Sequence, residues 1–324
     1  MQALILVGGE GTRLRPLTET LPKPAVPLCG RPLVARMIDW VARHGATEVI
    51  LACGFRTDRL RAVLGDGERG GPALRYVEEP EPRGTAGAMK QAEELISGRF
   101  LALNGDVLAD LDLTALIEHH ERVGATATLG LYPVPDTSAY GDVRTGESDA
   151  VTAFVEKPSP EDAGPGEINA GAYVLEPEVL DRVPSGVECS IEREVFPGLI
   201  GDGLYAKRLE GYWIDVGTPQ RFLQASWDVL EGRVQVEGGG GGGPLIADSA
   251  EVDPAAQIAS RAVVGERCVI GARAEISESV LLDGCHVGEG AIVRGSILAP
   301  GSRVAPGARL EPGTVTAEAQ EVQA

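Results

Sequence analysis

The sequence predicts an α/β chain in two parts, a doubly wound, mainly parallel sheet followed by a parallel β-helix. The first observation is an alternation of strand-like and helix-like runs through about residue 135 of the 324-residue chain. Such alternation implies right-handed crossovers and a sheet covered on both faces. The second observation is a six-residue spacing of aliphatic residues beyond residue 245, which is typical of a solenoid.

The expected elements of the first part follow one another along the chain. Strands are expected at residues 4–7, 48–53, 74–77, 100–104 and 126–132. Helices are expected at 32–44, 58–64, 86–96 and 113–123, on the evidence of aliphatic residues at helical spacing. From residue 142 to 217 the pattern changes to strands joined by turns, which predicts a flap over the parallel core. The flap strands are expected at 151–156, 168–175, 204–209 and 212–216, and a closing helix at 219–230.

The repeat in the second part places one large aliphatic residue on each rung of the predicted β-helix. Two steps of five residues interrupt the six-residue period, and small residues lie four places after most of the aliphatic ones. Twelve rungs at three per turn make about four coils. The pattern is similar to the left-handed hexapeptide-repeat β-helix. The aliphatic positions are Ile246, Val252, Ile258, Val264, Ile270, Ile276, Leu282, Val287, Val293, Leu298, Val304 and Leu310.

Residues 238 to 243 are six consecutive glycines, followed by Pro244. Because glycine has no side chain to pack, we expect a flexible linker here. The sequence therefore predicts an α/β domain over residues 1–232, a glycine-rich linker over 233–244, a β-helix over 245–315 and a tail over 316–324.

Composition and charge argue against some classes of binding partner and indicate a cellular compartment. The formal net charge is −19, which argues against nucleic acid or an anionic membrane as a partner, since a phosphate backbone requires a basic face. The apolar run at the N-terminus stops at Gly8, too short for a signal peptide or a membrane span. The five cysteines are odd in number and widely spaced, which favours reduced thiols and a cytoplasmic setting.

A glycine-rich turn directly follows the first expected strand. Gly8, Gly9 and Gly11 let backbone N–H groups come close to a phosphate, because no Cβ stands in the way. Arg13 in the same turn adds a charged fork suited to phosphate oxygens, and Lys23 follows between two prolines. The alternative interpretation is an ordinary glycine turn after a strand.

Two aspartates stand at the ends of expected strands. Asp106 follows Asn104 and Gly105, and Asp215 precedes Val216 and a glycine. Each aspartate could cap a following helix. One or two carboxylates together with substrate phosphates is also the usual way in which Mg²⁺ is held.

The string GGxGTRLxPLT, followed by LPKP, resembles the signature of the sugar-1-phosphate nucleotidylyltransferases. The resemblance implies a Rossmann-like nucleotidyltransferase domain that acts on a nucleoside triphosphate and a sugar 1-phosphate, with Mg²⁺ on Asp106 and Asp215. The string FVEKP also matches the family, in which its lysine meets the phosphate of the sugar and its glutamate a sugar hydroxyl. Out of context, an EK dipeptide is usually a surface ion pair.

The resemblance assigns further residues by motif. The loop at residues 79–88 looks like the family's base-recognition loop, although Thr85 could equally cap the following helix. Arg13 and Lys23 are implied as the catalytic residues. The implied nucleotide-binding residues are Leu6, Gly8, Gly9, Gly11, Thr12, Arg13, Gly84, Thr85, Asn104 and Gly105. The implied sugar-phosphate-binding residues are Lys23, Gly141, Glu156, Lys157, Asn169 and Ala170.

Within the family, the strings SIEREVFPGL, INAGAYVL and LYAKRLEGYWIDVGTP are most similar to mannose-1-phosphate guanylyltransferases. That resemblance implies GTP and α-D-mannose 1-phosphate as substrates. Thymidylyl and uridylyl transfer to glucose 1-phosphate remain alternatives, since nothing in the loop chemistry alone distinguishes guanine from thymine.

Two rival functions follow from the same sequence. A β-helix that transfers acyl groups needs a general base, and His286 is the one histidine in the repeat. A non-catalytic regulatory subunit would have no physical reason to keep a complete phosphate and metal set. We therefore expect an active enzyme whose β-helix serves assembly, as a homo-oligomer.

Overall fold

The computed structural model describes residues 1–54, 56–67, 70–156, 158–159, 161 and 163–323. The chain forms two compact units, each assembled from separate stretches of sequence. The first unit comprises Met1–Gly9, Met37–Val107 and Leu111–Trp213. The second comprises Glu10–Arg36, Leu108–Asp110 and Ile214–Ala324.

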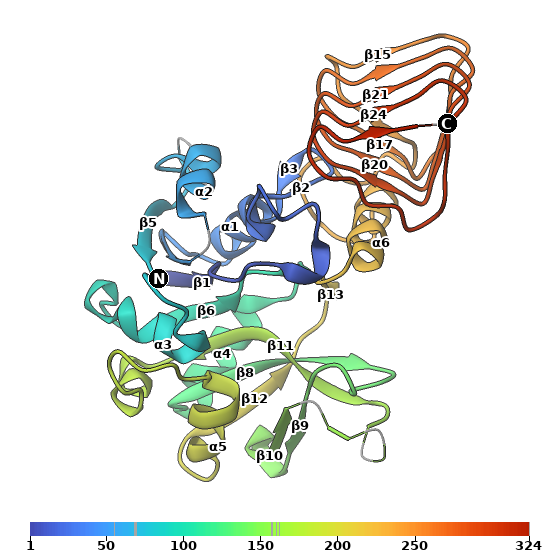
Figure 1. Cartoon of the computed structure of the whole chain (residues 1–324). Coiled ribbons are helices and arrows are strands. Elements are labelled where there is room, and N and C mark those ends of the chain that lie inside the picture. The colour runs from blue at the N-terminus through green and yellow to red at the C-terminus, as the bar shows by residue number, and fades with distance from the viewer. Residues whose placement is uncertain (55, 68–69, 157, 160, 162, 324) are drawn as a thin grey trace. The chain divides into compact units, whose positions relative to one another are not determined.

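The first unit is built on a mixed nine-stranded sheet, whose parallel half confirms the predicted α/β fold (Figure 1). Leu4 and Ile5 of the first strand are fully buried, as expected of a parallel strand covered on both faces. The parallel strands lie in the order β6 (Phe100–Asn104), β1 (Gln2–Leu6), β4 (Glu48–Cys53) and β5 (Ala73–Glu78).

The other half of the sheet is largely antiparallel, and it contains strands that the sequence predicts as a separate flap, so the flap prediction is wrong for these strands. Strand β11 (Gly166–Leu175) runs antiparallel to both β6 and β8 (Ala127–Val134), and β12 (Leu204–Arg208) runs parallel to β8. Strands β9 (Gly141–Thr145) and β10 (Val151–Glu156) form a hairpin. The sequence does not predict β9, because its GDVRT string carries one apolar residue and no alternation.

The helices fall where the apolar periodicity places them, apart from the short α5, which the sequence does not predict. One expected helix is split, because the chain leaves α3 (Gly84–Gln91) and makes a separate 3₁₀ turn at Glu93–Leu95. The other helices are α1 (Leu33–Arg43), α2 (Thr57–Leu64), α4 (Leu113–Val123), α5 (Phe196–Leu199) and α6 (Pro219–Leu230). Two short strand pairs lie outside the nine-stranded sheet. Strand β2 (Pro27–Leu28) pairs with β3 (Arg31–Pro32), and β7 (Val107–Ala109) pairs with β13 (Trp213–Asp215).

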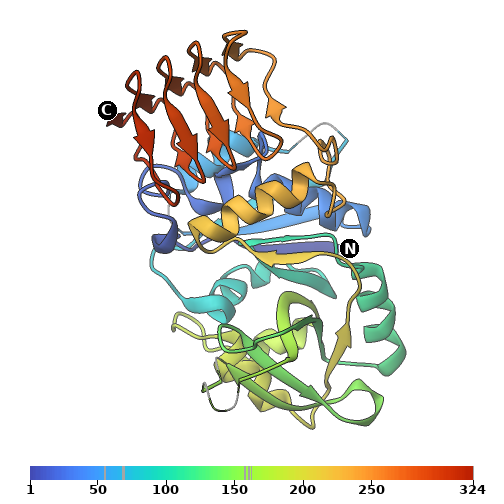
Figure 2. The ribbon, with the colours of Figure 1, turned by 90° about the vertical axis from the view of Figure 1, so that its right-hand side faces the viewer.

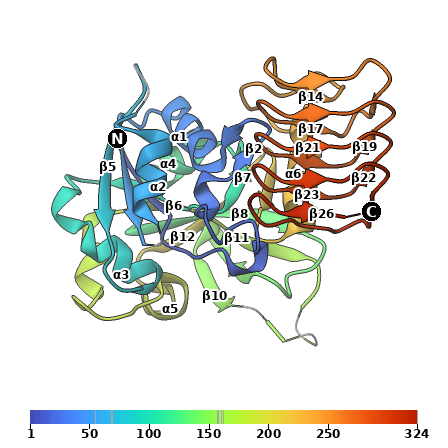
Figure 3. The same ribbon diagram turned by 45° about the horizontal axis from the view of Figure 1, so that its top comes forward.

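The second unit contains the predicted left-handed parallel β-helix, whose coils stack one on another (Figures 2 and 3). Val264, Ile270 and Ile276 fill the inside, while Ala262 and Cys268 are completely buried in the narrow positions. One sheet contains β14 (Leu245–Ile246), β17 (Val263–Val264), β20 (Val280–Leu281) and β23 (Ile297–Leu298). The second contains β15 (Glu251–Val252), β18 (Val269–Ile270), β21 (His286–Val287), β24 (Arg303–Val304) and β26 (Glu321–Val322). The third contains β16 (Gln257–Ile258), β19 (Glu275–Ser277), β22 (Ile292–Arg294) and β25 (Arg309–Leu310).

The C-terminal residues continue the β-helix. Strand β26 pairs in parallel with β24, through Arg303 opposite Glu321 and Val304 opposite Val322. The segment expected as a tail thus adds a rung to one face, since its Glu-Val pair repeats the charged-aliphatic pattern of the earlier rungs.

The glycine run differs from the expected flexible linker. The backbone N–H of Gly240 donates to the carbonyl of Val229 at 3.0 Å, and that of Gly242 donates to Leu230 at 3.0 Å. These carbonyls belong to the last turn of α6, where a helix leaves its acceptors unsatisfied. The run therefore caps α6 with its own backbone.

A β-helix side chain also contacts α6. The Arg261 Nε donates to Glu231 Oε1 at 2.6 Å, and its guanidinium carbon lies 5.2 Å from the centre of the Trp227 ring. Among the described residues, none of the helices has the length and apolar character needed to cross a membrane. All five cysteines are buried.

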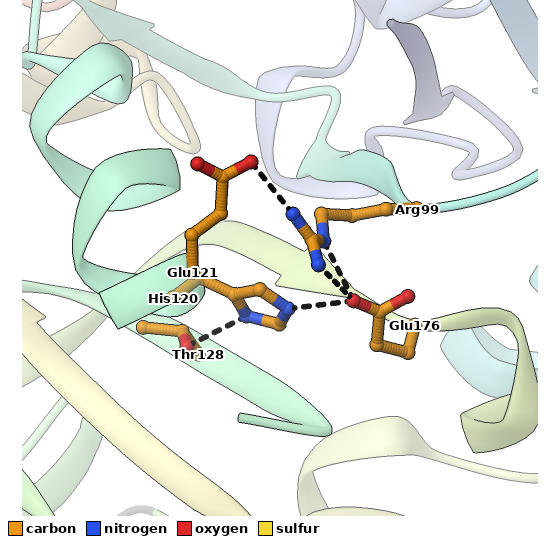
Figure 4. Close-up of polar contacts among 5 residues, drawn as sticks. All are labelled: Arg99, His120, Glu121, Thr128 and Glu176. Carbon is orange, nitrogen blue, oxygen red and sulfur yellow. Dashed lines mark hydrogen bonds and ion pairs between the residues drawn. The ribbon is translucent and has the colours of Figure 1, made fainter. Parts of the chain in front are cut away.

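Two adjacent histidines in α4 are buried in the first unit, and one of them joins a polar network (Figure 4). The two ring nitrogens of His120 lie 2.8 Å from Thr128 Oγ1 and 3.3 Å from Glu176 Oε1. Arg99 bonds the same Glu176 oxygen at 2.6 Å and Glu121 at 2.8 Å. Burial lowers the pKa of His120 below its usual value, and the Glu176 carboxylate only partly offsets this.

We expect the free energy of unfolding to fall as the pH drops from 7.5 to 5.5. His120 is held neutral in the folded chain, whereas in the unfolded chain it takes up a proton near pH 6.5, so acid favours unfolding. Each histidine held neutral in this way can change the free energy of unfolding by at most about 1.4 kcal/mol per pH unit. Urea titrations of the wild type and of His120→Gln measure the effect, and the variant should show the flatter pH dependence. Equal slopes would contradict the prediction.

Candidate active site

The segment after the first strand places Gly11 where only glycine fits. Its φ is +63°, and a Cβ there would lie 2.9 Å from the Cβ of Lys23. Thr18 Oγ1 donates to the Gly11 carbonyl at 2.8 Å and holds the turn. Thr12 and Arg13 follow in the 3₁₀ turn Thr12–Leu14. The glycine thus brings the turn against Lys23.

Arg13, Lys23 and Asp215 gather around Gly217 within the second unit. Lys23 is 7% exposed, and its Nζ lies 3.9 Å from Asp215 Oδ1. A Cβ on Gly217 would lie 2.6 Å from Arg13 Nη2 and 2.8 and 2.9 Å from the two Asp215 carboxylate oxygens. Two cationic side chains gathered at one place suit a phosphate. The structure thus brings together three residues that the motifs assign to phosphate and metal binding.

The two aspartates are not helix caps. The N-cap of α6 is Thr218, whose side chain accepts from the N–H of Arg221, and the N-cap of α4 is Asp112, which accepts from Ala115. Asp215 ends β13, the partner strand of β7, and Asp106 immediately precedes β7. The capping alternative weighed for Asp106 and Asp215 is therefore wrong.

Glycines in the first unit allow β1 to approach its neighbours closely. A Cβ on Gly105 would lie 2.2 Å from the Leu6 carbonyl oxygen, which accepts a hydrogen bond from the Gly105 N–H at 2.9 Å. A Cβ on Gly54 would lie 2.7 Å from the Gly8 carbonyl oxygen. Gly9 has open space around it. The glycine at 105 is thus required by the backbone of β1.

The expected base-recognition loop is tied to the segment that precedes α5. Gly84 has a φ of +68°, and a Cβ there would lie 2.6 Å from the Cys189 carbonyl oxygen. Thr85 Oγ1 donates to Glu192 Oε2 at 2.7 Å and accepts from the Ile191 N–H at 2.8 Å. Helix α3 begins at Gly84 and has no side-chain cap, so Thr85 is not its N-cap.

Replacing Thr85 with valine should lower the free energy of unfolding by about 1–3 kcal/mol, because Glu192 and the Ile191 N–H lose a half-buried partner. Thr85→Ser keeps the hydroxyl and serves as the matched control. Urea denaturation measures both variants. A valine variant as stable as the serine variant would show that the hydroxyl contributes nothing.

A bulge in β11 shapes the expected sugar side of the site. The strand register shifts between Asn169 and Tyr173, where Gly171 has a φ of +69°. The Asn169 Oδ1 accepts from the Gly171 N–H at 3.0 Å, and its Nδ2 donates to the Tyr173 hydroxyl at 2.8 Å. Part of the amide expected to meet the sugar therefore holds the bulge. A Cβ on Gly171 would lie 2.8 Å from Asn104 Nδ2, so the bulge lies against the end of β6.

Trp213 is a site residue that the sequence reasoning missed. Its Nε1 donates to the Ala170 carbonyl at 2.8 Å. Its ring lies 5.6 Å from that of Tyr132 and 5.4 Å from that of Tyr140. Its place two residues before Asp215, in the same string, is the signal that could have identified it.

The structure describes only some of the remaining residues that are expected to bind the sugar phosphate. Gly141 and Glu156 pair across the β9–β10 hairpin. Lys157 lies outside the described residues, as does the side chain of Glu156. A second missed residue, Glu79, follows β5 directly, and its Oε1 lies 2.9 Å from the position that a Cβ on Gly8 would take.

The fold and the site together define the class of protein. Parallel α/β sheets bind ligands beyond the carboxyl ends of their strands, and the turns after β1, β5 and β6 lie on that edge. Together with the cations around Asp215, this indicates an α/β enzyme that acts on phosphate esters.

Comparison with known proteins identifies the family. The chain matches the Nucleotidyl transferase family over residues 2–232 and the GMPPB C-terminal domain over residues 242–324. It belongs to the nucleotidyl transferase family and is a nucleotidyltransferase.

Curated relatives match most of the chain. It is 41% identical over 262 residues to the mannose-1-phosphate guanylyltransferase of Mycobacterium tuberculosis, covering 79% of this chain and 72% of that protein. It is 38% identical over 265 residues to the mannose-1-phosphate guanyltransferase beta-A of Xenopus laevis, covering 80% and 73%. It is 34% identical over 251 residues to a UTP–glucose-1-phosphate uridylyltransferase of Synechocystis, covering 72% and 65%.

A solved structure is similar as well. HddC of Yersinia pseudotuberculosis, complexed with GMP-PN, matches with a TM-score of 0.59 and 28% identity. The match covers 69% of this chain and 97% of that one.

Proposed function

We propose that the protein transfers GMP from GTP to α-D-mannose 1-phosphate, giving GDP-mannose and pyrophosphate. The observation that carries the proposal is the cluster of Arg13, Lys23 and Asp215, built for phosphates, in a chain about 40% identical to mannose-1-phosphate guanylyltransferases. An oxygen of the sugar phosphate attacks the α-phosphorus in line, a new phosphorus–oxygen bond forms, and the bond to the β-phosphate oxygen breaks. No protein nucleophile is needed.

The side chains act by alignment and by charge. Arg13 holds the triphosphate and stabilises the negative charge that develops on pyrophosphate. Lys23, together with Lys157, holds the phosphate of the sugar. Lys23 is preorganised because it is buried and faces Asp215, so its ammonium does not have to shed water as the reaction proceeds.

The nucleotide and the sugar contact further residues in this proposal. Backbone groups of Gly8, Gly9, Gly11, Gly84 and Thr85 cradle the nucleotide. Glu156 and the bulge at Asn169 and Ala170 meet the sugar hydroxyls, with Trp213 holding the Ala170 carbonyl.

A divalent cation, Mg²⁺, fits the donor set. Asp106 and Asp215 supply hard carboxylate oxygens, and the described residues contain no group of three His, Cys, Asp or Glu side chains that could hold a metal ion by themselves. Mg²⁺ is commonly bound in this way, with substrate phosphates completing its ligands. When bound it would neutralise phosphate charge.

The test is a matrix of nucleoside triphosphates against sugar 1-phosphates, read by pyrophosphate release. The proposal expects the highest kcat/KM for GTP with mannose 1-phosphate, and activity that a chelator removes and Mg²⁺ restores. A preference for UTP or dTTP with glucose 1-phosphate would move the assignment to uridylyl or thymidylyl transfer, the activity named for one of the relatives. The proposed setting is the cytoplasm, in keeping with five cysteines that are all free thiols.

We further propose a homo-oligomer assembled through the β-helix. The first rung leaves Ile246 38% exposed, and an open stack presents unpaired strand edges that a second copy covers.

Ending the chain at Pro244 should lower the mass per particle measured by light scattering, while nucleotide binding survives. Keeping residues 238–243 in the shortened chain preserves the backbone cap of α6. An unchanged mass per particle would remove the assembly role.

A further inference from the structure

We propose that Arg36 is the positioning residue of Lys23. By binding the hairpin of β2 and β3 to the segment after α6, it fixes the place at which the Lys23 ammonium meets the phosphate of the sugar. The inference rests on the proposed function, because it concerns a cation of the same site. The motifs that define the site do not include Arg36, and its partners named below lie with it in the second unit.

Arg36 is a buried cation in the first turn of α1, only 3% exposed. Its Nε and Nη2 donate to the Leu28 carbonyl at 3.1 and 2.8 Å, and Nη2 also donates to the Cys29 carbonyl at 3.1 Å. Its Nη1 donates to the Glu237 carbonyl at 2.9 Å. Different nitrogens of one planar fork thus bind the hairpin and the chain after α6, a geometry that a point-like ammonium does not reproduce.

The tip of the hairpin is strained. Cys29 and Gly30 connect β2 to β3 with φ values of +50° and +76°. A two-residue turn of this kind needs positive φ at both positions, and a residue with a side chain adopts it only where its surroundings impose it. The Cys29 carbonyl accepts from Arg36, and its Sγ donates to the Ser226 carbonyl at 3.4 Å. The tip is therefore held from two sides, by α1 and by α6.

Only Val26 separates the hairpin (Figure 1) from the 3₁₀ turn that carries Lys23. The Val26 N–H donates to the Lys23 carbonyl at 3.1 Å, and the Val26 carbonyl accepts from the N–H of Leu33, the first residue of α1, at 3.1 Å. Prolines on both sides of Lys23 and at the start of β2 fix the φ angle at those positions. A displacement of the hairpin is therefore passed on to the backbone of Lys23.

The carboxylate that faces Lys23 belongs to the segment before α6. Asp215 is followed by Thr218, the N-cap of α6, and Ser226 lies two turns into the same helix. The Lys23 Nζ and Asp215 Oδ1 lie 3.9 Å apart. The lysine and the carboxylate thus come from two segments that are joined through the hairpin, and Arg36 holds that junction.

Loss of the guanidinium should act on the sugar phosphate more than on the nucleotide. The Leu28 and Cys29 carbonyls would lose buried donors, so the hairpin would shift and move Lys23 with it. In the proposed reaction Lys23 holds the phosphate of the sugar, whereas Arg13 holds the triphosphate. We therefore expect the effect mainly in KM for mannose 1-phosphate.

The experiment measures steady-state pyrophosphate release by full-length Arg36→Lys, with GTP and mannose 1-phosphate varied in turn. Lysine keeps the charge but donates from one nitrogen only. We expect kcat/KM for mannose 1-phosphate to fall about 10- to 100-fold, the cost of a small misplacement in an active site. KM for GTP should stay within about 2-fold of the wild type, the limit for sites that act independently. An equal rise in both KM values, or none in either, would overturn the inference.

A double-mutant cycle with Lys23→Ala separates positioning from a general loosening of the fold. Once the ammonium is absent, Arg36→Lys should lower kcat/KM by about 2-fold or less. A loss as large as in the wild-type background overturns the inference and leaves the proposed function in place. Arg99→Lys is the matched control, because Arg99 pairs with Glu121 and Glu176 in the first unit and should keep both KM values.

Cys29→Ala decides the inference if Arg36→Lys does not fold. It removes the bond of the hairpin to the Ser226 carbonyl and leaves the buried guanidinium paired, so it should raise the same KM by a smaller factor. An unchanged KM for mannose 1-phosphate in that variant would count against Arg36. If the wild type itself prefers UTP with glucose 1-phosphate, the proposed function fails, and the same cycle run with that pair still decides the role of Arg36.

Discussion

Replacing Arg13 with alanine is expected to lower kcat by about 10²–10³-fold, the loss seen when one preorganised electrostatic donor is removed. The guanidinium lies beside the Asp215 carboxylate at Gly217, where two cations face one anion. Its loss leaves Lys23 as the single described cation of that group. Steady-state pyrophosphate release measures the change.

Arg15→Ala controls for the loss of a nearby positive charge. Arg15 lies two residues further along and pairs with Glu10 on the surface at 2.9 Å, an exposed ion pair that contributes little. It should turn over at close to the wild-type rate. Near-normal turnover in Arg13→Ala would remove Arg13 from the chemistry.

Gly217→Ala is expected to lower kcat by about 10²-fold with almost no change in melting temperature. The added methyl would lie within 3 Å of Arg13 Nη2 and of both Asp215 oxygens, so those side chains must move, and displacement of that order costs about 10² in rate. The φ of Gly217 is not positive, so the backbone itself tolerates alanine.

Gly198→Ala is the control for the alanine substitution, since a Cβ there meets nothing within 4 Å. Melting curves and kcat measured on both variants separate a displaced site from a destabilised fold. A Gly217→Ala enzyme with wild-type kcat would show that the side chains around residue 217 need not keep their positions.

The fold could be predicted from the sequence wherever side chains carry the information. Helix α6 begins and ends where the apolar pattern places it. The rungs of the β-helix follow the aliphatic spacing except at one, where Leu281 and not the expected Leu282 packs inside the β-helix and pairs with Val264, so the first five-residue step comes one rung earlier than predicted. The glycine run could not be predicted, because its hydrogen bonds to Val229 and Leu230 come from the backbone alone and leave no side-chain pattern.

The candidate site likewise could be predicted from the sequence only where its residues belong to motifs. Arg13, Lys23 and Asp215 belong to motifs, and the structure gathers them. Glu79 lies in a string of glutamates and prolines that resembles a solvated loop, and only the sheet places it at Gly8. The motif predicts that Asn169 contacts the sugar. In the structure its amide forms hydrogen bonds with Gly171 and Tyr173, and these depend on a bulge that the apolar periodicity does not reveal.

The stacking of the β-helix has a consequence for how this chain can change in length. Each strand pairs only with the strands one coil before and one coil after it, as Val264 does with Ile246 and Leu281. Stability in such an array is close to a sum of neighbour terms, so a whole coil can be duplicated or deleted without altering the coils on either side. Arg261, which contacts α6, lies on the connection just before β17, near the beginning of the stack. Evolution, or an engineer, can therefore use the distal coils as an adjustable spacer, and genes that differ by one coil should encode proteins that keep the same α6 contact.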